Sequence, residues 1–432
     1  MPRPSPYASS RLPDAPASLA PRPLSPDPAQ PLPRVRVKSL SLNPTVYRKR
    51  IDEVERTARA GDLVAVHDDD ERLLGYGLYN PKSEIAVRMV RFDGQLPDDA
   101  FWNELLQRAV SLRRDVLKLD ASTDAYRVIY GESDGFPGLV VDKLGDVLSA
   151  EVFSLGMYQR AMEIVSRLAA LLGTKHILIR PAPYSLSQEG WEAPGYASEE
   201  LPSRTTIQEF GTRFRVQFNT GHKTGFFCDQ RDNRRQLAAF CAGKSVLDLC
   251  CYTGGFAVQA KKLGNAAEVI GVDLDENSIA IAKENANLNQ ARVRFIHSDA
   301  FNYMRDMLAA GRQFDVVVLD PPKLIRSRAE LEEGTRKHFS LNRLAMQLVA
   351  PGGLLLTCTC AGLLSAADFT NLVCTASRQC GRLLEPATEE RPEKRGARVA
   401  QIVAKTGAAA DHPIAAQCPE TEYLQAIWLR LF

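Results

Sequence analysis

Short apolar runs broken by turn residues dominate the chain between residues 34 and 91. Runs at residues 63–66, 75–79 and 85–90 are rich in the Val, Ile, Leu and Tyr side chains that strands favour. Several short strands this close together predict a small β-barrel. Across residues 98–117 the apolar positions change to helical spacing, so a helix is expected to follow the barrel.

Strands and one helix are mixed between residues 126 and 219. The pattern predicts a helix at residues 158–172 and strands at residues 126–130, 139–141, 148–153, 176–179 and 214–218. A turn-rich segment at residues 131–138 links the first two strands. We therefore expect a central α+β module, closed by the last of these strands.

From Gly221 onward, apolar strands alternate with helices in the βαβ manner that builds a mostly parallel sheet. The expected fold class is α/β, with a Rossmann-like domain preceded by a central α+β domain and a small β-barrel. The expected boundaries are 1–33 for a Pro-rich, non-folding extension, 34–92 for the barrel, 93–220 for the linker helix and α+β domain, and 221–432 for the Rossmann-like domain.

Composition bears on where the protein is located and on whether it binds a metal. Of the 432 residues, 45% are hydrophobic and 25% charged, the balance of a globular protein with real cores. No apolar run reaches the ~18–20 residues that cross a bilayer, and the Pro-rich start lacks a secretory signal. We expect a cytoplasmic protein with free thiols. The nine cysteines and six histidines have no zinc-ligand spacing, so no metal is expected.

Charge is nearly balanced overall, at +2, but it is unevenly distributed. Before Asp52 the only acids are Asp14 and Asp27, against nine Arg and Lys residues. A basic leader suits a phosphate backbone, which makes Arg34, Arg36 and Lys38 candidate RNA contacts. The alternative, for residues 1–33, is a solvated tail without a partner.

The strongest local motif begins at Ser245 and ends at Ala257. An apolar strand over residues 246–249 runs into a turn, and a helix restarts at Phe256. Gly254 and Gly255 let the backbone approach a ligand closely. This pattern predicts a cofactor turn whose contacts come from residues 252–256, namely Tyr252, Thr253, Gly254, Gly255 and Phe256.

Acids at the following strand tips indicate which cofactor binds there. Asp273 ends the next strand, where a carboxylate accepts hydrogen bonds from ribose hydroxyls. Asp299, followed by Ala300, stands at a third tip, where it can meet the exocyclic amine of adenine. The turn lacks the full glycine pattern that cradles a pyrophosphate, so S-adenosylmethionine, which has no phosphate, is the expected cofactor. The alternative is an ordinary βαβ turn with surface acids.

A second motif predicts the chemistry. Residues 314–319 form a buried strand that ends in Asp320-Pro-Pro, and prolines fix a rigid loop at the edge where open α/β sheets hold ligands. Such loops are common in nucleobase methyltransferases, where they hold the target base. Just beyond it, Lys323 and Arg326 are candidate contacts to RNA phosphates, or else part of a solvated face.

Two cysteines on the following strand narrow the reaction. After the turn Pro351-Gly-Gly353, the strand from Leu354 carries Cys358 and Cys360 near its carboxyl end. Carbon 5 of cytosine becomes nucleophilic only after a thiolate adds to carbon 6, so an enzyme acting there must supply a cysteine. Both cysteines share one face of a regular strand, and Cys360 lies nearer the tip. We therefore expect Cys360 as nucleophile and Asp320 as its companion, bonding the ring nitrogen and the exocyclic amine.

Together these residues resemble the RlmI-type bacterial large-subunit ribosomal RNA cytosine-5 methyltransferases. The resemblance runs from about Arg34 to Phe432. It rests on Gly131-Glu-Ser-Asp-Gly-Phe-Pro-Gly-Leu139, Gly221-His-Lys-Thr-Gly-Phe-Phe-Cys-Asp-Gln-Arg231, Tyr252-Thr-Gly-Gly-Phe256, Asp320-Pro-Pro-Lys323 and Asp411-His-Pro413.

The resemblance implies an N-terminal PUA domain, a central α+β domain and a Rossmann-like catalytic domain. It implies that Cys360 attacks the base and that ribosomal RNA is the partner. From the apolar runs and the ligand spacing alone, neither a membrane nor a metal is expected as a partner. It also places the segment 221–231 near the cofactor, with Lys223, Thr224, Phe226 and Gln230 as candidate contacts. A homodimer is a further expectation. The Pro-rich start and the segment 39–50 depart from the family pattern.

Two other functions stay open on the sequence alone. A guanine or adenine N-methyltransferase shares the Asp320 loop but needs no cysteine. An RNA-binding relic of the fold needs neither cofactor nor catalysis, and the acids at Asp273, Asp299 and Asp320 argue against it.

Overall fold

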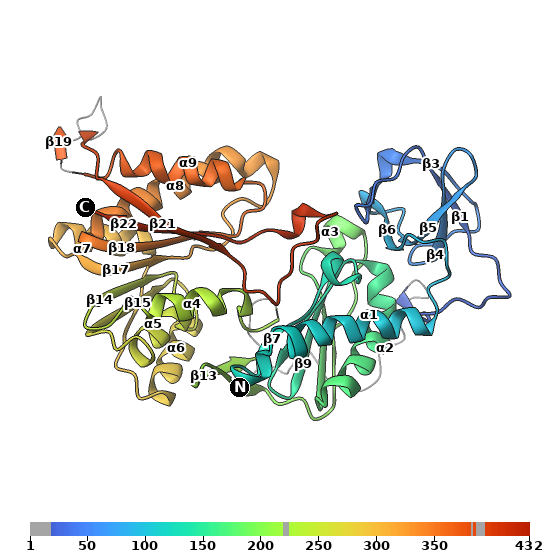
Figure 1. Ribbon diagram of the computed structural model, residues 1–432, viewed down its shortest axis with the longest axis horizontal. Coiled ribbons are helices and arrows are strands. Elements are labelled where there is room, and N and C mark those ends of the chain that lie inside the picture. Colours follow the sequence, from blue (N-terminus) through green and yellow to red (C-terminus); the bar gives the residue numbers. More distant parts are fainter. Residues whose placement is uncertain (1–18, 219–223, 382, 386–393) are drawn as a thin grey trace. The chain divides into compact units, whose positions relative to one another are not determined.

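The computed structural model describes residues 19–218, 224–381, 383–385 and 394–432 (Figure 1). The chain divides into two compact units. The first unit holds the residues up to Ile207 together with Val216–Cys228 and Ala410–Thr421, and the second holds Gln208–Arg215, Asp229–Ala409 and Glu422–Phe432. Within the described residues, no helix is both long and apolar enough to cross a membrane.

The first unit begins with a six-stranded sheet in the order β2-β6-β5-β4-β1-β3. Every neighbouring pair is antiparallel except β1 and β4, which are parallel. One core, which includes Val35, Val64 and Val87, is buried by this sheet. Its strands are β1 (Arg34–Val37), β2 (Thr45–Tyr47), β3 (Ile51–Val54), β4 (Leu63–His67), β5 (Leu73–Tyr79) and β6 (Ile85–Arg91).

A second, five-stranded sheet completes the first unit, in the order β11-β10-β9-β8-β7. Helix α2 connects the parallel pair β9 and β10, and together with α1 it buries a core around Trp102, Tyr126 and Phe136. The elements are α1 (Asp99–Ser111), β7 (Ala125–Tyr130), β8 (Leu139–Leu144), β9 (Val147–Val152), α2 (Leu155–Leu172), β10 (His176–Pro181), α3 (Ser185–Glu189) and β11 (Tyr196–Ala197).

Residues 19–33 differ from the expected non-folding extension. Leu24 is buried, and its carbonyl accepts a hydrogen bond of 3.0 Å from Trp102 Nε1. The Arg22 guanidinium pairs with Asp62, and its backbone N–H donates to the Gln159 carbonyl at 2.9 Å. Prolines prevent a helix here, but the extended chain they favour still packs through leucines and backbone groups. The expectation was wrong for these residues, and residues 1–18 lie outside the described part of the chain.

The expected closing strand of the central module belongs to a separate hairpin. Strands β12 (Arg204–Glu209) and β13 (Thr212–Gln217) pair only with each other. The backbone N–H groups of Arg213 and Arg215 donate to the side chains of Asn289 and Asn285 in the second unit. Alternating apolar residues therefore predicted the strand correctly but not its partner, because period alone does not choose a sheet.

The second unit is a seven-stranded sheet in the order β16-β15-β14-β17-β18-β22-β21. The first five strands are parallel, whereas β22 runs antiparallel to both β18 and β21. The strands are β14 (Ser245–Leu249), β15 (Glu268–Asp273), β16 (Arg294–His297), β17 (Phe314–Leu319), β18 (Val349–Thr359), β21 (Ala400–Gly407) and β22 (Gln425–Leu431). The predicted Rossmann-like α/β fold is confirmed.

Helices cover both faces of this sheet (Figure 1). One face carries α4 (Arg231–Ala238), α5 (Gly255–Lys262) and α6 (Glu276–Leu288). The other carries α7 (Ala300–Ala309), α8 (Leu331–Leu348) and α9 (Ala366–Ser377), which bury a large core around Leu319, Met346 and Phe369. A two-stranded hairpin, β19 (Leu383–Glu385) and β20 (Lys394–Arg395), follows α9.

Candidate active site

Parallel pairing brings four strand ends to one edge of the second unit's sheet. Leu249 at the end of β14 pairs with Val272 of β15 and Leu319 of β17, and Leu319 pairs with Thr357 of β18. The residues that follow these strands are therefore neighbours along the carboxyl edge, where open α/β sheets bind ligands. The sequence placed its candidate cofactor turn, Asp273, Asp320 and Cys360 there.

The turn after β14 has an unusual backbone. Cys250, Tyr252 and Gly254 have φ of 62°, 48° and 80°, in the left-handed region that side chains disfavour. A Cβ on Gly254 would stand 2.9 Å from the Phe295 ring, so glycine is required on two grounds. The absence of a side chain at Gly254 lets the turn pack against Phe295 and Ala282.

Asp273 fixes this turn to the next strand. Its carboxylate accepts the backbone N–H of Tyr252 at 2.7 Å and that of Asp275 at 2.9 Å. Each carboxylate oxygen has two lone pairs, so both keep an acceptor position for a hydroxyl group. The half-buried carboxylate beside a glycine turn fits the ribose of S-adenosylmethionine.

Asp248, within β14, is a buried acid that the sequence did not single out. Its Oδ2 accepts the Ala257 N–H at 3.0 Å, which ties the start of α5 to the strand below. Burial, reinforced by the charges of Asp320 and Asp273, holds the pKa of this carboxyl well above its usual range. Among the described residues, Asp248 Oδ1 has no hydrogen-bond partner.

Asp299 and Ala300 stand at the beginning of α7. Asp299 is the N-cap residue, and its Oδ1 accepts the Asn302 N–H at 3.0 Å. Capping uses one lone pair of Oδ1, so the carboxylate keeps acceptor positions for the predicted contact with an adenine amine. In the structure Asp299 therefore caps α7, and its contact with adenine stays a prediction.

Asp320 follows β17, and hydrogen bonds hold both its backbone and its carboxylate. Its N–H donates to the Leu249 carbonyl at 3.3 Å, and its Oδ2 accepts Gln230 Nε2 at 3.0 Å. Gln230, predicted as a cofactor contact, therefore lies beside the predicted catalytic carboxylate. Its side chain is buried immediately before α4.

The two cysteines of β18 differ in exposure. Cys358 is fully buried within the strand, and this burial holds the pKa of its thiol well above the ordinary value. Cys360 lies one residue past the end of β18 and is half-buried. The regular alternation that put both thiols on one face ends at Thr359.

His338, on α8, supports the strand end from below and was missed by the sequence analysis. Its Nε2 lies 3.2 Å from the Thr359 hydroxyl, which also accepts the Ala361 N–H. Burial lowers the pKa of His338 to about 4, so the imidazole is neutral near pH 7. No spacing signal in the sequence links a histidine to a threonine 21 positions away.

The remaining predicted contacts belong to the first unit or to residues that the structure does not describe. Thr224 and Phe226 are buried in the first unit, where the Thr224 hydroxyl donates to Asp142 and its carbonyl accepts Ser149 Oγ at 2.7 Å. Lys223 lies outside the described residues. Arg36 pairs with Asp52, Glu53 and Glu71 on the six-stranded sheet.

Other candidate RNA contacts are on the surface. Arg34 and Lys38 are exposed in the first unit, and Lys323 and Arg326 are exposed just past the Asp320 loop in the second. All nine cysteines are free thiols. In the described part of the chain, no group of three or more His, Cys, Asp or Glu side chains could hold a metal ion.

This sheet, with a glycine turn and an acid at the next strand tip, defines a class I S-adenosylmethionine-dependent methyltransferase. The family model of S-adenosylmethionine-dependent methyltransferases matches residues 184–392, and a PUA-like domain model matches residues 35–92. The chain belongs to the family of the ribosomal RNA large subunit methyltransferase I proteins. Its cofactor is S-adenosylmethionine.

Two relatives illustrate the extent of the match. Ribosomal RNA large subunit methyltransferase I of Aeromonas hydrophila is 36% identical over 404 residues, covering 91% of this chain and 97% of that protein. The protein of the same name from Vibrio vulnificus is 34% identical over 390 residues, covering 89% and 94%.

Solved structures show the same fold. A methyltransferase crystallised with S-adenosylhomocysteine superposes with a TM-score of 0.76 at 19% identity, covering 92% of this chain and 99% of its own. A methyltransferase from Streptococcus mutans superposes with a TM-score of 0.72 at 18% identity, with the same coverage.

Proposed function

We propose that this enzyme methylates carbon 5 of a cytosine in large-subunit ribosomal RNA, with Cys360 as a covalent nucleophile. The curated relatives are named for ribosomal RNA of the large subunit, which supports the substrate class. A half-buried thiol at the same sheet edge as Asp320 carries the proposal for the atom that is methylated. A nitrogen methyltransferase has no use for that thiol.

The proposed steps follow from the chemistry of the base. The Cys360 thiolate forms a bond to carbon 6, which places electron density on carbon 5. The carboxyl group of Asp320, in its protonated form, donates its O–H to ring nitrogen 3 and accepts a hydrogen bond from the exocyclic amine. It thereby stabilises the negative charge that develops on the ring. S-adenosylmethionine, when bound, supplies an electrophilic methyl group. Loss of the carbon 5 proton to a base then expels the thiolate and restores the double bond.

In our proposal the cofactor binds at the same sheet edge, beside the ends of β14, β15 and β16. Asp273 accepts the ribose hydroxyls, and Asp299 with Ala300 borders the adenine. The turn residues Tyr252, Thr253, Gly254, Gly255 and Phe256 line the rest, together with Gln230. Lys223, Thr224 and Phe226 stay proposed contacts from the segment before α4. The exposed Lys323 and Arg326, and Arg34 and Lys38 of the PUA-like domain, are proposed to contact RNA phosphates.

The decisive experiment compares Cys360→Ala with Cys358→Ala. Cys360→Ala is expected to abolish methyl transfer to large-subunit ribosomal RNA while titration calorimetry shows unchanged binding of S-adenosylmethionine. Cys358→Ala removes a buried thiol of the same strand, so it should lower stability and leave most turnover.

Trapping gives an independent readout. RNA with 5-fluorocytosine at the target should form a stable adduct with the wild-type enzyme, because fluorine cannot leave as a proton does, and none with Cys360→Ala. Retained turnover in Cys360→Ala, with methyl groups found on a ring or exocyclic nitrogen, would instead establish the N-methyltransferase alternative. Mass spectrometry of ribosomal RNA from a cytoplasmic extract of a deletion strain would locate the missing methyl group.

A further inference from the structure

Side-chain hydrogen bonds in the second unit form an unbroken chain from Trp428 to Asp320. Trp428 Nε1 donates to Thr406 Oγ1 at 2.9 Å, and Thr406 Oγ1 donates to Asn233 Oδ1 at 2.7 Å. Asn233 Nδ2 donates to Gln230 Oε1 at 2.7 Å, and Gln230 Nε2 donates to Asp320 Oδ2 at 3.0 Å. Four links therefore join β22, β21 and α4 to the carboxylate after β17.

The direction of this chain is set at its Trp428 end. An indole N–H can only donate, so Thr406 must accept from it and has its own hydrogen free for Asn233. The Asn233 carbonyl oxygen then faces Thr406, and its amide N–H2 faces Gln230. The second hydrogen of that amide donates to the Gly407 carbonyl at 3.1 Å. If the Asn233 amide were flipped, its oxygen would face the Gln230 Oε1 and Gly407 carbonyl oxygens, and neither hydrogen bond could form.

The same logic fixes Gln230. Since its oxygen accepts from Asn233, its amide N–H2 faces Asp320. A flipped amide would oppose the Gln230 oxygen to a carboxylate oxygen, two acceptors without a hydrogen between them. Trp428, Asn233 and Gln230 are all buried, so water cannot readily replace a lost link.

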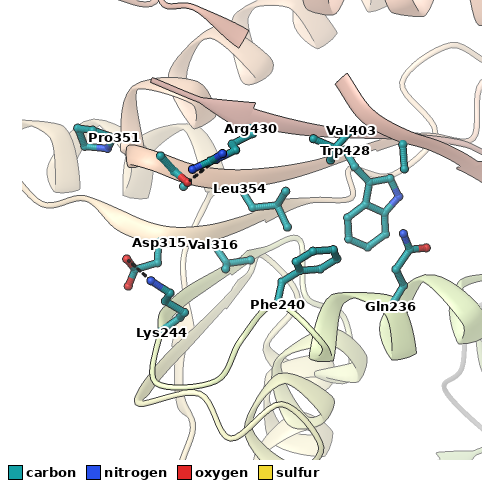
Figure 2. A pocket seen from close by; sticks show the side chains of 13 residues that line it. Gln236, Phe240, Lys244, Asp315, Val316, Pro351, Leu354, Val403, Trp428 and Arg430 are labelled. Atoms are coloured by element: carbon teal, nitrogen blue, oxygen red, sulfur yellow. Dashed lines mark hydrogen bonds and ion pairs between the residues drawn. The ribbon is translucent and has the colours of Figure 1, made fainter. Parts of the chain in front are cut away.

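Packing holds the indole that starts the chain. The Trp428 ring lines a hollow of about 390 Å³ with Phe240, Gln236 and Leu354 (Figure 2). The Phe240 and Trp428 ring centroids are 6.1 Å apart at 44°. Lys244 and Asp315, at the beginnings of β14 and β17, border the same hollow. The hollow therefore lies at the amino ends of these strands, and the chain runs from it to the carboxyl edge.

We propose that Thr406 and Asn233 are positioning residues for methyl transfer, because they lock the Gln230 amide in the orientation that donates to Asp320. The role of Asp320 rests on the function proposed above. Neither residue touches the base or the cofactor in this scheme. Their effect passes through the Gln230 amide, whose hydrogen bond to Oδ2 sets the orientation of the Asp320 carboxylate.

Thr406→Val tests the chain because it removes the hydroxyl and keeps the shape. Valine suits a strand, and Thr406 is half-buried on the edge strand β21, so the variant is expected to fold. We expect the kcat for methyl transfer to fall about tenfold, which corresponds to the net contribution of about one hydrogen bond. The KM for S-adenosylmethionine should stay within twofold, since the turn after β14 is untouched.

Rescue and control variants separate positioning from simple damage. Thr406→Ser restores the hydroxyl and is expected to recover most of the kcat. Thr375→Val changes a threonine on α9 whose hydroxyl donates to the Asn371 carbonyl of the same helix, so its kcat should match the wild type. If Thr406→Val were to misfold, Thr406→Ala would carry the same test.

The readout is total methyl incorporation from labelled S-adenosylmethionine, whichever atom receives it. An unchanged kcat in Thr406→Val, or failure of Thr406→Ser to recover a loss, would overturn the positioning role and leave the carbon 5 proposal intact. Methyl groups found on a nitrogen would overturn the carbon 5 proposal, while the Thr406 comparison would still report on the chain.

Discussion

Cys358 and Cys360 are two residues apart, yet their surroundings give their thiols different chemistry. Cys358 is sealed within β18, and a buried thiol resists losing its proton because the charged form is not solvated. Cys360 stands past the strand end and is half-buried. A nucleophile must meet its substrate, so burial favours Cys360 where sequence spacing could not choose.

His338, which contacts Thr359 between the two cysteines, predicts how folding stability depends on pH. Its pKa is lowered from 6.5 to about 4 in the folded chain, because burial disfavours the charged imidazole. Between these values the unfolded chain binds more protons, so folding stability falls as the pH drops from about 6.5 to about 4. The total loss from this group is of the order of 3 kcal/mol.

Urea unfolding of wild type and His338→Gln at several pH values measures this contribution. The variant should show a shallower fall of the unfolding free energy across the interval, since it has no imidazole to charge. His297→Gln, which changes an exposed histidine at the end of β16, should keep the wild-type slope. Identical slopes for wild type and His338→Gln would contradict the assignment.

The sequence predicted the positions of site residues that end a strand or directly follow one. Asp273 and Asp320 end apolar strands, and parallel pairing puts such ends together. Residues that act through a distant segment were not predictable. His338 meets Thr359, and Asn233 meets Thr406 from 173 positions away, through contacts that only the folded sheet creates.

At the scale of elements, the turn after β14 depends on α4 and β12. Arg234 of α4 and Glu209 of β12 form a buried ion pair, with bonds of 2.6 and 3.0 Å, and Gln259 of α5 donates to the same carboxylate at 2.9 Å. A Cβ on Gly255 would lie 3.0 Å from Arg234 Cδ. The pair therefore packs directly under the start of α5.

Glu209→Gln tests this support. It leaves the buried Arg234 charge without its carboxylate, which should lower the unfolding free energy by about 3–5 kcal/mol. Binding of S-adenosylmethionine should weaken as well, because the turn rests on Arg234. Glu268→Gln breaks the half-exposed pair with Arg312 and should cost less than about 1 kcal/mol. Denaturant unfolding and titration calorimetry measure both variants, and equal losses would rule out a special role for the buried pair.

The periodicity of the sequence predicted most strands of the sheets but not every pairing. The βαβ alternation from Gly221 gave the parallel part, β14 to β18, because each strand there is an apolar run with a helix after it. It did not give β22, whose antiparallel insertion between β18 and β21 depends on a long return of the chain. It also did not show that β13 pairs with β12 alone, because the period of a strand does not choose its sheet.

At the scale of the whole molecule, the chain leaves and re-enters each unit repeatedly. Between β21 and β22 of the second unit, residues Ala410–Thr421 belong to the first unit. Buried Asp411 anchors them there, because its Oδ2 accepts the Arg127 N–H of β7 at 2.8 Å, and its carbonyl accepts Arg113 Nη2 at 2.6 Å. Tyr130 adds a bond of 2.6 Å to the Thr421 carbonyl.

Asp411→Ala should therefore loosen the segment 410–421 within the first unit. It removes the acceptor of the Arg127 amide, and hydrogen bonds to charged groups contribute about 1.5–3 kcal/mol. We expect faster amide hydrogen exchange in β7 and across residues 410–421, because the free energy of local opening is lower there. Glu420→Gln, an exposed acid of the same segment, should leave exchange unchanged.

Since β21 and β22 are joined through this segment, exchange should also rise at Gly407 and Gln425, the strand ends nearest to it. Unchanged exchange at those ends would mean that the sheet of the second unit holds them without help from the anchor.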